Sequence, residues 1–510
     1  MGEDARDEAE ITAIKVRGHL CSTDKADYLV HLYEEQGERF LETINGGFSG
    51  VLMDYRRRRT FLFNDRFGLN RLYYHENDKG LFFSSEAKPL LRVFPQLRSY
   101  NYKSLGQFFS WGCVLDNNTL FSDIRLIPGG SLWSFVPGGK SERSAYFQRT
   151  AWEEQAVLSD TQFYDKLSDT WARILPRYFH RREKTAISLN GSLSSRLIMA
   201  WAPCPPYRVP CFTTKDLNTD SVDLKIARSL ARCCQQHHEA IEIKRNFFSE
   251  FPALAKKAIN YTDGARGVRG AVDLYISKLV REIAPVYITD HFGEQIFNRN
   301  IGLRPLLLDN HIFERDFLAR IQKDALSPQL RVQMNSLSVL AFLQIPFSES
   351  PRLALANTQL AVRLPSLDID LMRTVYQTPA DNIGYNRPLC QLIFKGFPAL
   401  KRLAFVREGK RRFLSLGSIL RQYFGGAGLQ MASARKDDYQ FQSWYRGPLS
   451  NYVKDILLDP RTLERPYLNK AGVESLVHRH IAGEGDFAPE ISSLLTCELV
   501  QRQLMRSSDA

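Results

Sequence analysis

Three kinds of pattern follow one another in Thr185-Ala186-Ile187-Ser188-Leu189-Asn190-Gly191-Ser192-Leu193-Ser194-Ser195-Arg196. An apolar run comes first, small and polar residues come next, and a helical pattern begins at the end. The short apolar run over Thr185–Leu189 predicts a buried strand. The residues from Ser195 to Trp201 predict a helix, and the small residues between the two segments predict a tight loop. The stretch therefore predicts a strand–loop–helix unit.

Strand and helix patterns continue to alternate on the C-terminal side of this unit. Pro210–Thr213, Ala240–Ile243 and Val286–Thr289 are apolar runs of strand length, and Ser221–Gln236 has helical spacing of its apolar residues. Strands that alternate with helices predict a parallel α/β sheet. Beyond residue 310 the patterning is almost wholly helical, with prolines as breaks.

On the N-terminal side the pattern is different. Short apolar runs over residues 44–91 are separated by turn residues, which predicts an antiparallel meander with Arg56–Arg59 at a hairpin tip. Residues 121–148 add strands around Pro128-Gly129-Gly130 and Pro137-Gly138-Gly139. We therefore predict a mostly β domain over residues 1–150 and a second domain over residues 155–510.

Composition limits the class of protein. With 510 residues, 44% of them hydrophobic, the chain is long enough for two or three globular domains. The net charge of +12 permits a polyanionic partner, but the basic runs are better interpreted as solvated turns, so nucleic-acid binding is unlikely. The eight cysteines have no metal-ligand spacing, and neither a secretory signal nor a membrane span is found. We predict a cytoplasmic protein with reduced thiols.

Four short motifs in the N-terminal part occur in an informative order. They are Asn45-Gly46-Gly47-Phe48, Asn64-Asp65-Arg66-Phe67-Gly68, Leu72-Tyr73-Tyr74 and Ser84-Ser85-Glu86-Ala87-Lys88. Their order and spacing resemble the glutaminase domain of the asparagine synthetase family, whose members include lasso-peptide cyclases and β-lactam synthetases. The resemblance implies an α+β glutaminase-like domain of the Ntn type, followed by an α/β ATP-pyrophosphatase-like domain with a helical C-terminal extension.

The loop after Leu189 resembles the pyrophosphate-binding loop of that family, which is written Ser-Gly-Gly-Leu-Asp-Ser. The resemblance implies that ATP is held by Asn190, Gly191, Ser192, Leu193, Ser194 and Ser195. Small residues let backbone N–H groups approach phosphate oxygens at a helix N-terminus. The family's metal-binding aspartate is replaced by Ser194, so Mg²⁺ binding should be weaker. A serine-rich helix cap without a ligand is the competing interpretation. Thr213 matches the family's adenine-side strand.

A second loop, over Val286–Phe297, resembles the family segment Leu-Thr-Gly-x-Gly-Gly-Asp-Glu-Leu-Phe. Gly293 keeps a small residue, and Glu294 falls where the family has the aspartate that serves magnesium, so we predict Glu294 as a metal ligand and catalytic residue. Phe292 and Gln295 depart from the pattern. Asp290 and His291 are candidates to compensate, although a lone histidine beside a strand end is more often structural.

Further on, Arg363–Leu371 resembles a family segment with two aspartates, and we expect Asp368 and Asp370 to cap the next helix rather than to catalyse. The family has a catalytic lysine after this segment. Arg387 stands closest to its position and keeps the positive charge, and Lys410 is a second candidate.

The resemblance implies an ATP-dependent ligase that adenylates a small-molecule or peptide carboxylate and then joins it to an amine or ammonia. An alternative is a catalytically inactive member that serves as a scaffold or regulator with a protein partner. It is favoured by the substitutions at Gly2, Ser192, Ser194, Gln295 and Arg387. Both hypotheses stay open at this stage.

The N-terminus departs from the family, in which a cysteine after the initiator methionine uses its own α-amine as the base for its thiol. Position 2 is Gly2, and Cys21 is internal and has no free α-amine. We therefore expect a remnant domain without glutaminase activity.

The purified protein should not release glutamate from glutamine, because no thiol with an adjacent free amine is expected. The measurement is glutamate release by the native protein and by a Cys21→Ala variant. Release that the substitution abolishes would contradict the expectation.

Overall fold

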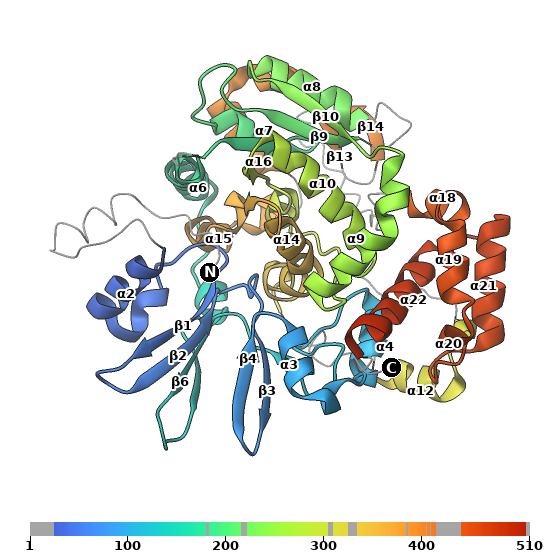
Figure 1. The fold of residues 1–510 in the computed structure, drawn as a ribbon. Coiled ribbons are helices and arrows are strands. Elements are labelled where there is room, and N and C mark those ends of the chain that lie inside the picture. Colours follow the sequence, from blue (N-terminus) through green and yellow to red (C-terminus); the bar gives the residue numbers. More distant parts are fainter. Residues whose placement is uncertain are drawn as a thin grey trace.

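The computed structural model describes residues 25–179, 183–215, 222–303, 310–324, 334–383, 386–403, 405–407, 410–414 and 440–505. Antiparallel sheets lie at the lower left of Figure 1, a parallel sheet with its helices lies at the top, and C-terminal helices lie at the right. Gly2, Cys21 and the side chain of Lys410 lie outside the described part of the chain. Within that part, no helix is long and apolar enough to cross a membrane.

Two antiparallel sheets form the N-terminal region, with the strand orders β1-β2-β6-β7 and β4-β3-β5. Their strands are β1 (Ser49–Asp54), β2 (Arg59–Asn64), β3 (Tyr73–Asn77), β4 (Gly80–Ser84), β5 (Arg125–Leu126), β6 (Ser131–Phe135) and β7 (Glu142–Ala145). The hairpin with arginines at its tip is confirmed, because residues 55–58 form the turn between β1 and β2. The prediction of a single meander was wrong, because β2 pairs with β6 while β3 belongs to the other sheet.

The turn after β2 separates the two sheets. The Asp65 carboxylate accepts hydrogen bonds of 3.0 Å from the backbone N–H groups of Phe67, Leu69 and Asn70. Burial raises the pKa of Asp65 to about 6, although these hydrogen bonds oppose the shift. The tight turn directs the chain out of the first sheet, so that β3 starts a second one.

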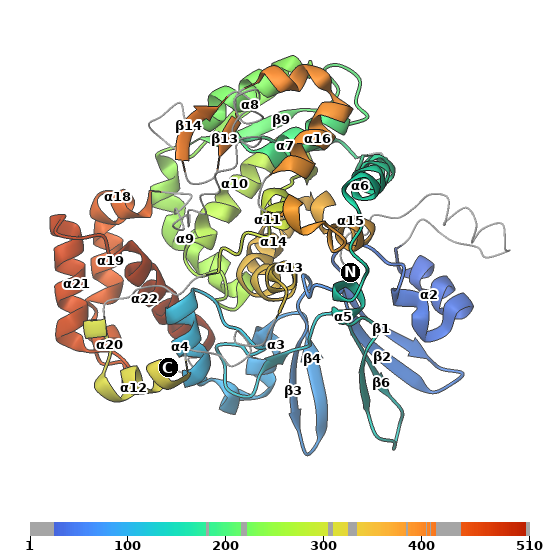
Figure 2. The ribbon, with the colours of Figure 1, turned by 180° about the vertical axis from the view of Figure 1, so that it is seen from behind.

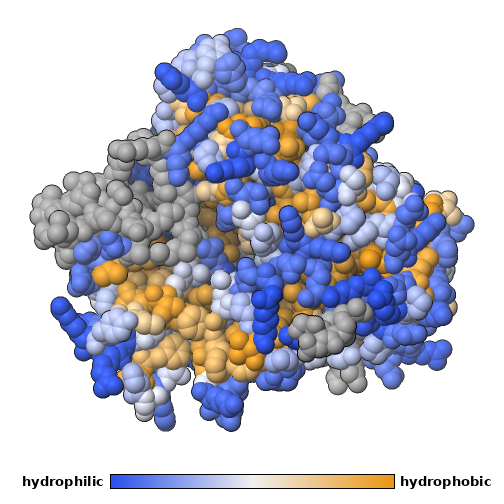
Figure 3. Space-filling view, viewed as in Figure 1, coloured by the Kyte–Doolittle hydropathy of each residue, from blue (hydrophilic) through white to orange (hydrophobic). Residues whose placement is uncertain are grey.

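The two sheets pack face to face, and the ring centroids of Tyr74 and Trp133 lie 5.1 Å apart between them. Helix α2 (Lys25–Gln36) covers the other face of the first sheet, where Tyr33 packs on Phe61 at 5.5 Å. Figure 3 shows an orange area in its lower part, over the antiparallel region. Exposed apolar side chains of this region include Val51, Met53 and Phe83.

Five parallel strands form the other sheet, in the order β10-β9-β8-β11-β12. They are β8 (Thr185–Ser188), β9 (Cys211–Lys215), β10 (His238–Glu242), β11 (Val286–Ile288) and β12 (Ala361–Arg363). The predicted α/β architecture is confirmed. Strand β12 corrects the expectation of an almost wholly helical chain beyond residue 310, and its three residues are too few to show an alternating pattern.

The strand order changes direction at β8, and the neighbouring carboxyl ends of β8 and β11 are here called the crevice. From β8 the chain runs outward through β9 and β10, and it then returns to place β11 and β12 on the other side of β8. The loops that leave β8 and β11 therefore diverge at neighbouring carboxyl ends, which is where open α/β sheets bind ligands. The helices that follow β8, β9 and β10 are α7 (Leu193–Trp201), α8 (Val222–Cys233), α9 (Asn246–Thr262) and α10 (Gly270–Ile283), all visible in Figure 2.

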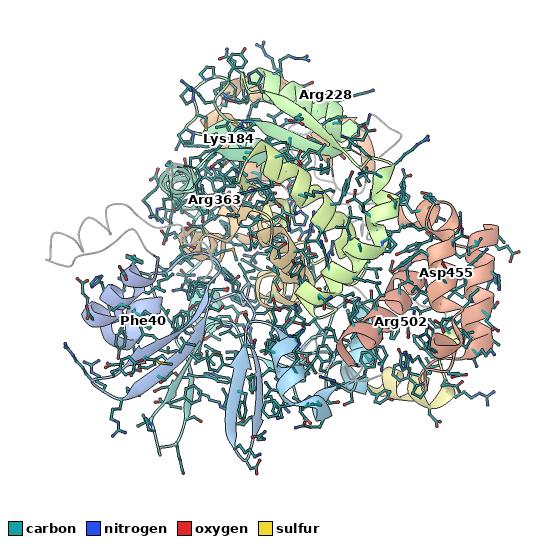
Figure 4. All side chains as sticks on the ribbon, in the orientation of Figure 1. Phe40, Lys184, Arg228, Arg363, Asp455 and Arg502 are labelled. Carbon is teal, nitrogen blue, oxygen red and sulfur yellow. The ribbon has the colours of Figure 1, made fainter. Side chains whose placement is uncertain are left out.

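One apolar core joins the N-terminal region to the C-terminal helices. It contains Phe109 from α4 (Tyr102–Trp111), Phe247 from α9 and Leu495 from α22 (Ala488–Val500). The Tyr100 hydroxyl donates a hydrogen bond of 2.6 Å to the backbone oxygen of Cys497. The remaining C-terminal helices are α18 (Phe441–Arg446), α19 (Ser450–Leu457), α20 (Pro460–Leu463) and α21 (Lys470–Ala482), and Arg502 lies beside them in Figure 4.

Asp368 ties the antiparallel region to the α/β part. Its carboxylate caps α15 (Ile369–Val375) by accepting from the Asp370 N–H at 2.9 Å, which confirms the predicted helix-capping role. The same side chain accepts from Asn45 Nδ2 at 2.6 Å and from the Tyr178 hydroxyl at 3.1 Å. Asn45 belongs to the first predicted glutaminase motif, so this motif contacts the segment that leads into α15.

A second link is Asp263, which ends α9 in the left-handed conformation at φ 51°. One carboxylate oxygen accepts from the Ala87 N–H at 2.9 Å, at the start of α3 (Ala87–Val93). Burial raises the pKa of Asp263 to about 6, against a reference value of 3.8. Since the folded pKa lies above the unfolded value, this group stabilises the fold below pH 4 and loses that contribution as the pH rises through 6.

Substituting Asp263→Asn should remove this pH dependence, since the amide oxygen can still accept from Ala87. Between pH 4 and pH 7 the native protein should lose about 2–3 kcal/mol more unfolding free energy than the variant. Urea denaturation across this range measures the difference. Parallel profiles for the two proteins would contradict the assignment.

Candidate functional site

The loop after β8 is closed by its own side chains. Helix α7 begins at Leu193, two residues before the predicted start, and Ser192 is its N-cap. The Ser192 hydroxyl accepts from the Ser195 N–H at 3.3 Å. Asn190 Oδ1 accepts from the Ser192 N–H at 3.0 Å and from the Ser195 hydroxyl at 2.8 Å. These contacts hold the loop in a tight turn at the N-terminus of the helix.

Two backbone N–H groups of this loop donate to carboxylates. Gly191 donates to Asp223 of α8 at 3.2 Å, and Leu193 donates to Oε1 of Glu294, which follows β11. A carboxylate oxygen and a phosphate oxygen are anionic acceptors of the same kind. The loop is therefore built to hold anionic oxygens, and the chain's own carboxylates occupy two of its donors.

The loop after β11 meets the first loop at Gly293 and Glu294, the first residues of α11 (Gly293–Asn298). A Cβ atom on Gly293 would lie 2.7 Å from Ser194 Cβ and 2.0 Å from Asp290 Oδ2. Only glycine permits this approach. The structure thus brings together Ser194, Gly293 and Glu294, which were predicted from the sequence to lie in one site. The two loops are distant in the chain, since Leu193 and Glu294 are 101 positions apart.

Asp290 lies at the same point, and 3% of its surface is exposed. Neither of its carboxylate oxygens has a hydrogen-bond partner. Burial, together with the negative charge of Glu294, raises the pKa of Asp290 well above its usual value. An unpartnered buried carboxylate is unfavourable, so Asp290 favours its protonated form unless a positive charge lies beside it.

A buried cation also lies close to the loops. Arg196 of α7 has no exposed surface, and its Nη1 donates to the backbone oxygen of Leu403 at 2.9 Å. Burial lowers the pKa of Arg196 to about 10, while the charge of Glu294 acts in the opposite direction. Arg196 is absent from the site predicted from the sequence, although an arginine among apolar helix residues was the available signal.

Thr213 turns inward instead of facing the loops. Its hydroxyl donates to the backbone oxygen of Leu189 at 2.8 Å and lies 2.8 Å from His238 Nε2. Burial lowers the pKa of His238 to about 4, so the imidazole is neutral near pH 7. Thr213, in the middle of β9, therefore connects the residue after β8 to the first residue of β10.

Of the two basic residues predicted for the site, Arg387 has a described side chain, and the contacts described for it are with another helix. Arg387 begins α16 (Arg387–Gly396), and its side chain is 51% exposed. Its guanidinium lies 3.8 Å from Asp160 and 5.9 Å from the ring centroid of Tyr164, both on α6 (Asp160–Ile174). Lys410 begins β14 (Lys410–Leu414), but its side chain lies outside the described residues.

A network of charged side chains lies beside Asp290. His291 Nε2 is 3.8 Å from Glu349, and Arg352 lies 3.2 Å from the same nitrogen. Asp273 of α10 accepts from Arg266 at 2.6 Å and pairs with Arg352 at 3.3 Å. Burial alone would raise the pKa of Glu349, but the hydrogen bond from His291 and the two arginines hold it well below its usual range. No sequence motif predicts these ion-pair partners of His291, because they come from separate segments of the chain.

Comparison with known proteins shows what parts of the chain are similar to. The family of glutamine amidotransferase domains matches residues 9–147. The glutamine-hydrolyzing asparagine synthetase 2 of Bacillus subtilis (strain 168) is 39% identical over 41% of this chain. Asparagine synthetase 1 of the same organism is 20% identical over 58% of this chain. Over these stretches the chain is similar to glutamine-hydrolyzing asparagine synthetases.

The matches span 30% and 46% of the length of these two asparagine synthetases. Among solved structures, the NMN synthetase of Francisella tularensis matches 48% of this chain and 94% of its own, with 13% identity and a TM-score of 0.20. The assignment of a parallel α/β sheet in this chain rests on its own strand order.

Substituting Gly293→Ala should destabilise the protein, because the added Cβ would overlap Asp290 and Ser194. We expect a loss of about 1–3 kcal/mol in unfolding free energy, as for other overpacked sites. Gly47→Ala is the matched control, since its Cβ would meet Leu69 at an ordinary 3.4 Å. Urea denaturation of both variants measures the effect, and equal stabilities would contradict the close approach of the two loops.

Proposed function

We propose that the chain is an ATP-dependent ligase that activates a carboxylate as its adenylate and transfers the acyl group to an amine. The observation that carries this proposal is the meeting of the two loops at the carboxyl ends of β8 and β11. There the Leu193 amide already binds the Glu294 carboxylate. Similarity to asparagine synthetases and the crevice beside the central strand support the same function.

In such a reaction a carboxylate oxygen of the substrate attacks the α-phosphorus of ATP, and the bond to the bridging oxygen breaks to release pyrophosphate. The amine nitrogen then attacks the acyl carbon, loses a proton and expels AMP. The chain's part is to hold the pyrophosphate group on the amides of residues 191–195, after Asp223 and Glu294 have left them. Mg²⁺ would neutralise phosphate charge beside Glu294, and Arg387 or Lys410 would supply further positive charge.

The substrates in this proposal are a small-molecule or peptide carboxylate and an amine that does not come from glutamine. Within described residues 25–150 the one cysteine is Cys113, whose thiol lies in the apolar core next to the end of α4. This burial supports a structural role for the glutaminase-like region, whose contacts at Asn45 and Ala87 hold the α/β part.

A second candidate function is that of a non-catalytic family member that acts as a scaffold or regulator. One observation favours it: the amides of Gly191, Ser192, Leu193 and Ser195 all have acceptors from the chain itself. Because these backbone N–H groups already have hydrogen-bond acceptors, the loop needs no ligand to be stable.

Restoring the family's loop chemistry distinguishes the two functions. The double variant Ser192→Gly, Ser194→Asp should bind Mg²⁺-ATP about 10- to 100-fold more tightly than the native chain, since one charged contact contributes on the order of 1.5–3 kcal/mol. Calorimetry with and without Mg²⁺ measures this, and Ser229→Asp on the exposed face of α8 controls for the added charge. If neither the native chain nor the double variant binds ATP, the ligase proposal is wrong and the scaffold stands.

A further inference from the structure

A cavity of about 210 Å³ lies between the antiparallel region and the α/β part of the chain. Its walls come from the turn after β2, from residues 126–129, from the chain after β7 and from η6 (Leu340–Glu349). None of the described residues that line it belongs to the loops after β8 and β11. Pockets for drug-sized ligands measure about 300–1,000 Å³, so this cavity fits a smaller molecule.

Three aromatic rings of the cavity wall lie close to one another. The Phe67 ring stacks on the Phe342 ring of η6, with the ring centroids 5.7 Å apart and the ring planes at 19°. The Phe147 ring centroid lies 5.9 Å from that of Phe342. Helix η6 is a π-helix, a rare form that occurs frequently at functional sites. The rings offer an apolar surface on which the body of a small ligand can pack.

Arginines line the same cavity, and they are Arg66, Arg71 and Arg149. Arg66 is 6% exposed, and two of its N–H donors bind the backbone oxygens of Ile44 and Glu42. The hydrogen bonds described for Arg66 and Arg71 thus go to uncharged oxygens. Burial lowers the pKa of Arg66, because a buried cation is poorly solvated.

Arg149 keeps N–H donors for a ligand. Its Nη1 donates to both carboxylate oxygens of Glu153, at 2.9 and 3.1 Å, whereas its Nε and Nη2 form no hydrogen bond with a described residue. Its side chain is 31% exposed, so solvent reaches this part of the cavity wall. Arg71 instead joins the two regions, since its Nη2 donates to the backbone oxygen of Pro346 in η6 at 3.1 Å.

Positive charge outweighs negative charge in the cavity wall. Asp116 is the one acidic residue among the described residues that line the cavity, and its Oδ2 accepts from Gln107 Nε2 at 3.3 Å. Buried charges in folded proteins are normally balanced by an opposite charge. A carboxylate fits a guanidinium well, because two parallel N–H groups can donate to its two oxygens. A monocarboxylate can also carry an apolar body, which suits the aromatic wall better than a strongly hydrated phosphate does.

We propose that this cavity binds a small monocarboxylate with an aromatic or branched apolar body. The carboxylate accepts hydrogen bonds from Arg66 and Arg149, and the apolar body packs on the three aromatic rings. The site is separate from the crevice and does not depend on the proposed ligase reaction. Because its walls come from both regions of the chain, the bound ligand stabilises the junction between them.

Calorimetry on the full chain with phenylacetate tests the proposal. Phenylacetamide keeps the ring without the charge, while acetate and inorganic phosphate keep a negative charge without the ring. Each of these three probes should bind at least tenfold more weakly than phenylacetate, because it lacks either the charge-assisted hydrogen bonds or the buried apolar area. No binding of phenylacetate, or equal binding of phosphate or acetate, would overturn the proposal.

The variant Arg149→Ala should weaken phenylacetate binding at least tenfold. Arg59→Ala is the matched control, since Arg59 is 30% exposed and also pairs with a glutamate, Glu38, but does not line the cavity. Its affinity for phenylacetate should equal that of the native chain. Thermal unfolding gives a second readout, because phenylacetate should raise the Tm of the native chain and of Arg59→Ala more than that of Arg149→Ala. Equal affinities for all three proteins would contradict the assignment of Arg149 to the site.

Discussion

Strand β8 lies between β9 and β11, and the arrangement of the candidate site depends on that position. Because the chain first builds the sheet on one side of β8 and then on the other, two loops that are distant in sequence leave neighbouring strand ends. The Leu193 amide then meets the Glu294 carboxylate, and Gly293 lies against Ser194. With a different strand order the same residues would lie at separate edges of the sheet.

The antiparallel region has a structural role that follows from its packing. Its helix α4 shares an apolar core with α9 and α22, while Asn45 and Ala87 hydrogen-bond to Asp368 and Asp263. Arg363, at the end of β12, lies near the centre of Figure 4, and its backbone oxygen accepts from the Thr289 N–H at 3.0 Å. The segments that carry the crevice loops are thus held by contacts on several sides.

The charged groups at the crevice differ in how they are paired. Arg196 and Glu294 are both buried and attract each other, whereas the charge of Glu294 acts against the ionised form of Asp290. Farther out, His291, Glu349, Arg352 and Asp273 form a paired network. Proteins tolerate locally unfavourable groups mainly at functional sites. The contrast between the paired network and Asp290 supports the proposal that the crevice is the functional end of the sheet.

The sequence by itself determined the strand–loop–helix unit at 185–201, the parallel sheet, the hairpin with its arginines and the capping role of Asp368. These features follow from local periodicity and from single side chains acting on nearby backbone. Only the tertiary structure decided that β2 and β3 belong to different sheets, that the three residues of β12 complete the parallel sheet, and that Arg387 faces α6. The burial of Asp290 and Arg196 also depends on it. Those outcomes depend on which distant segments pack together, and a linear pattern of apolar and polar residues does not specify its own partners.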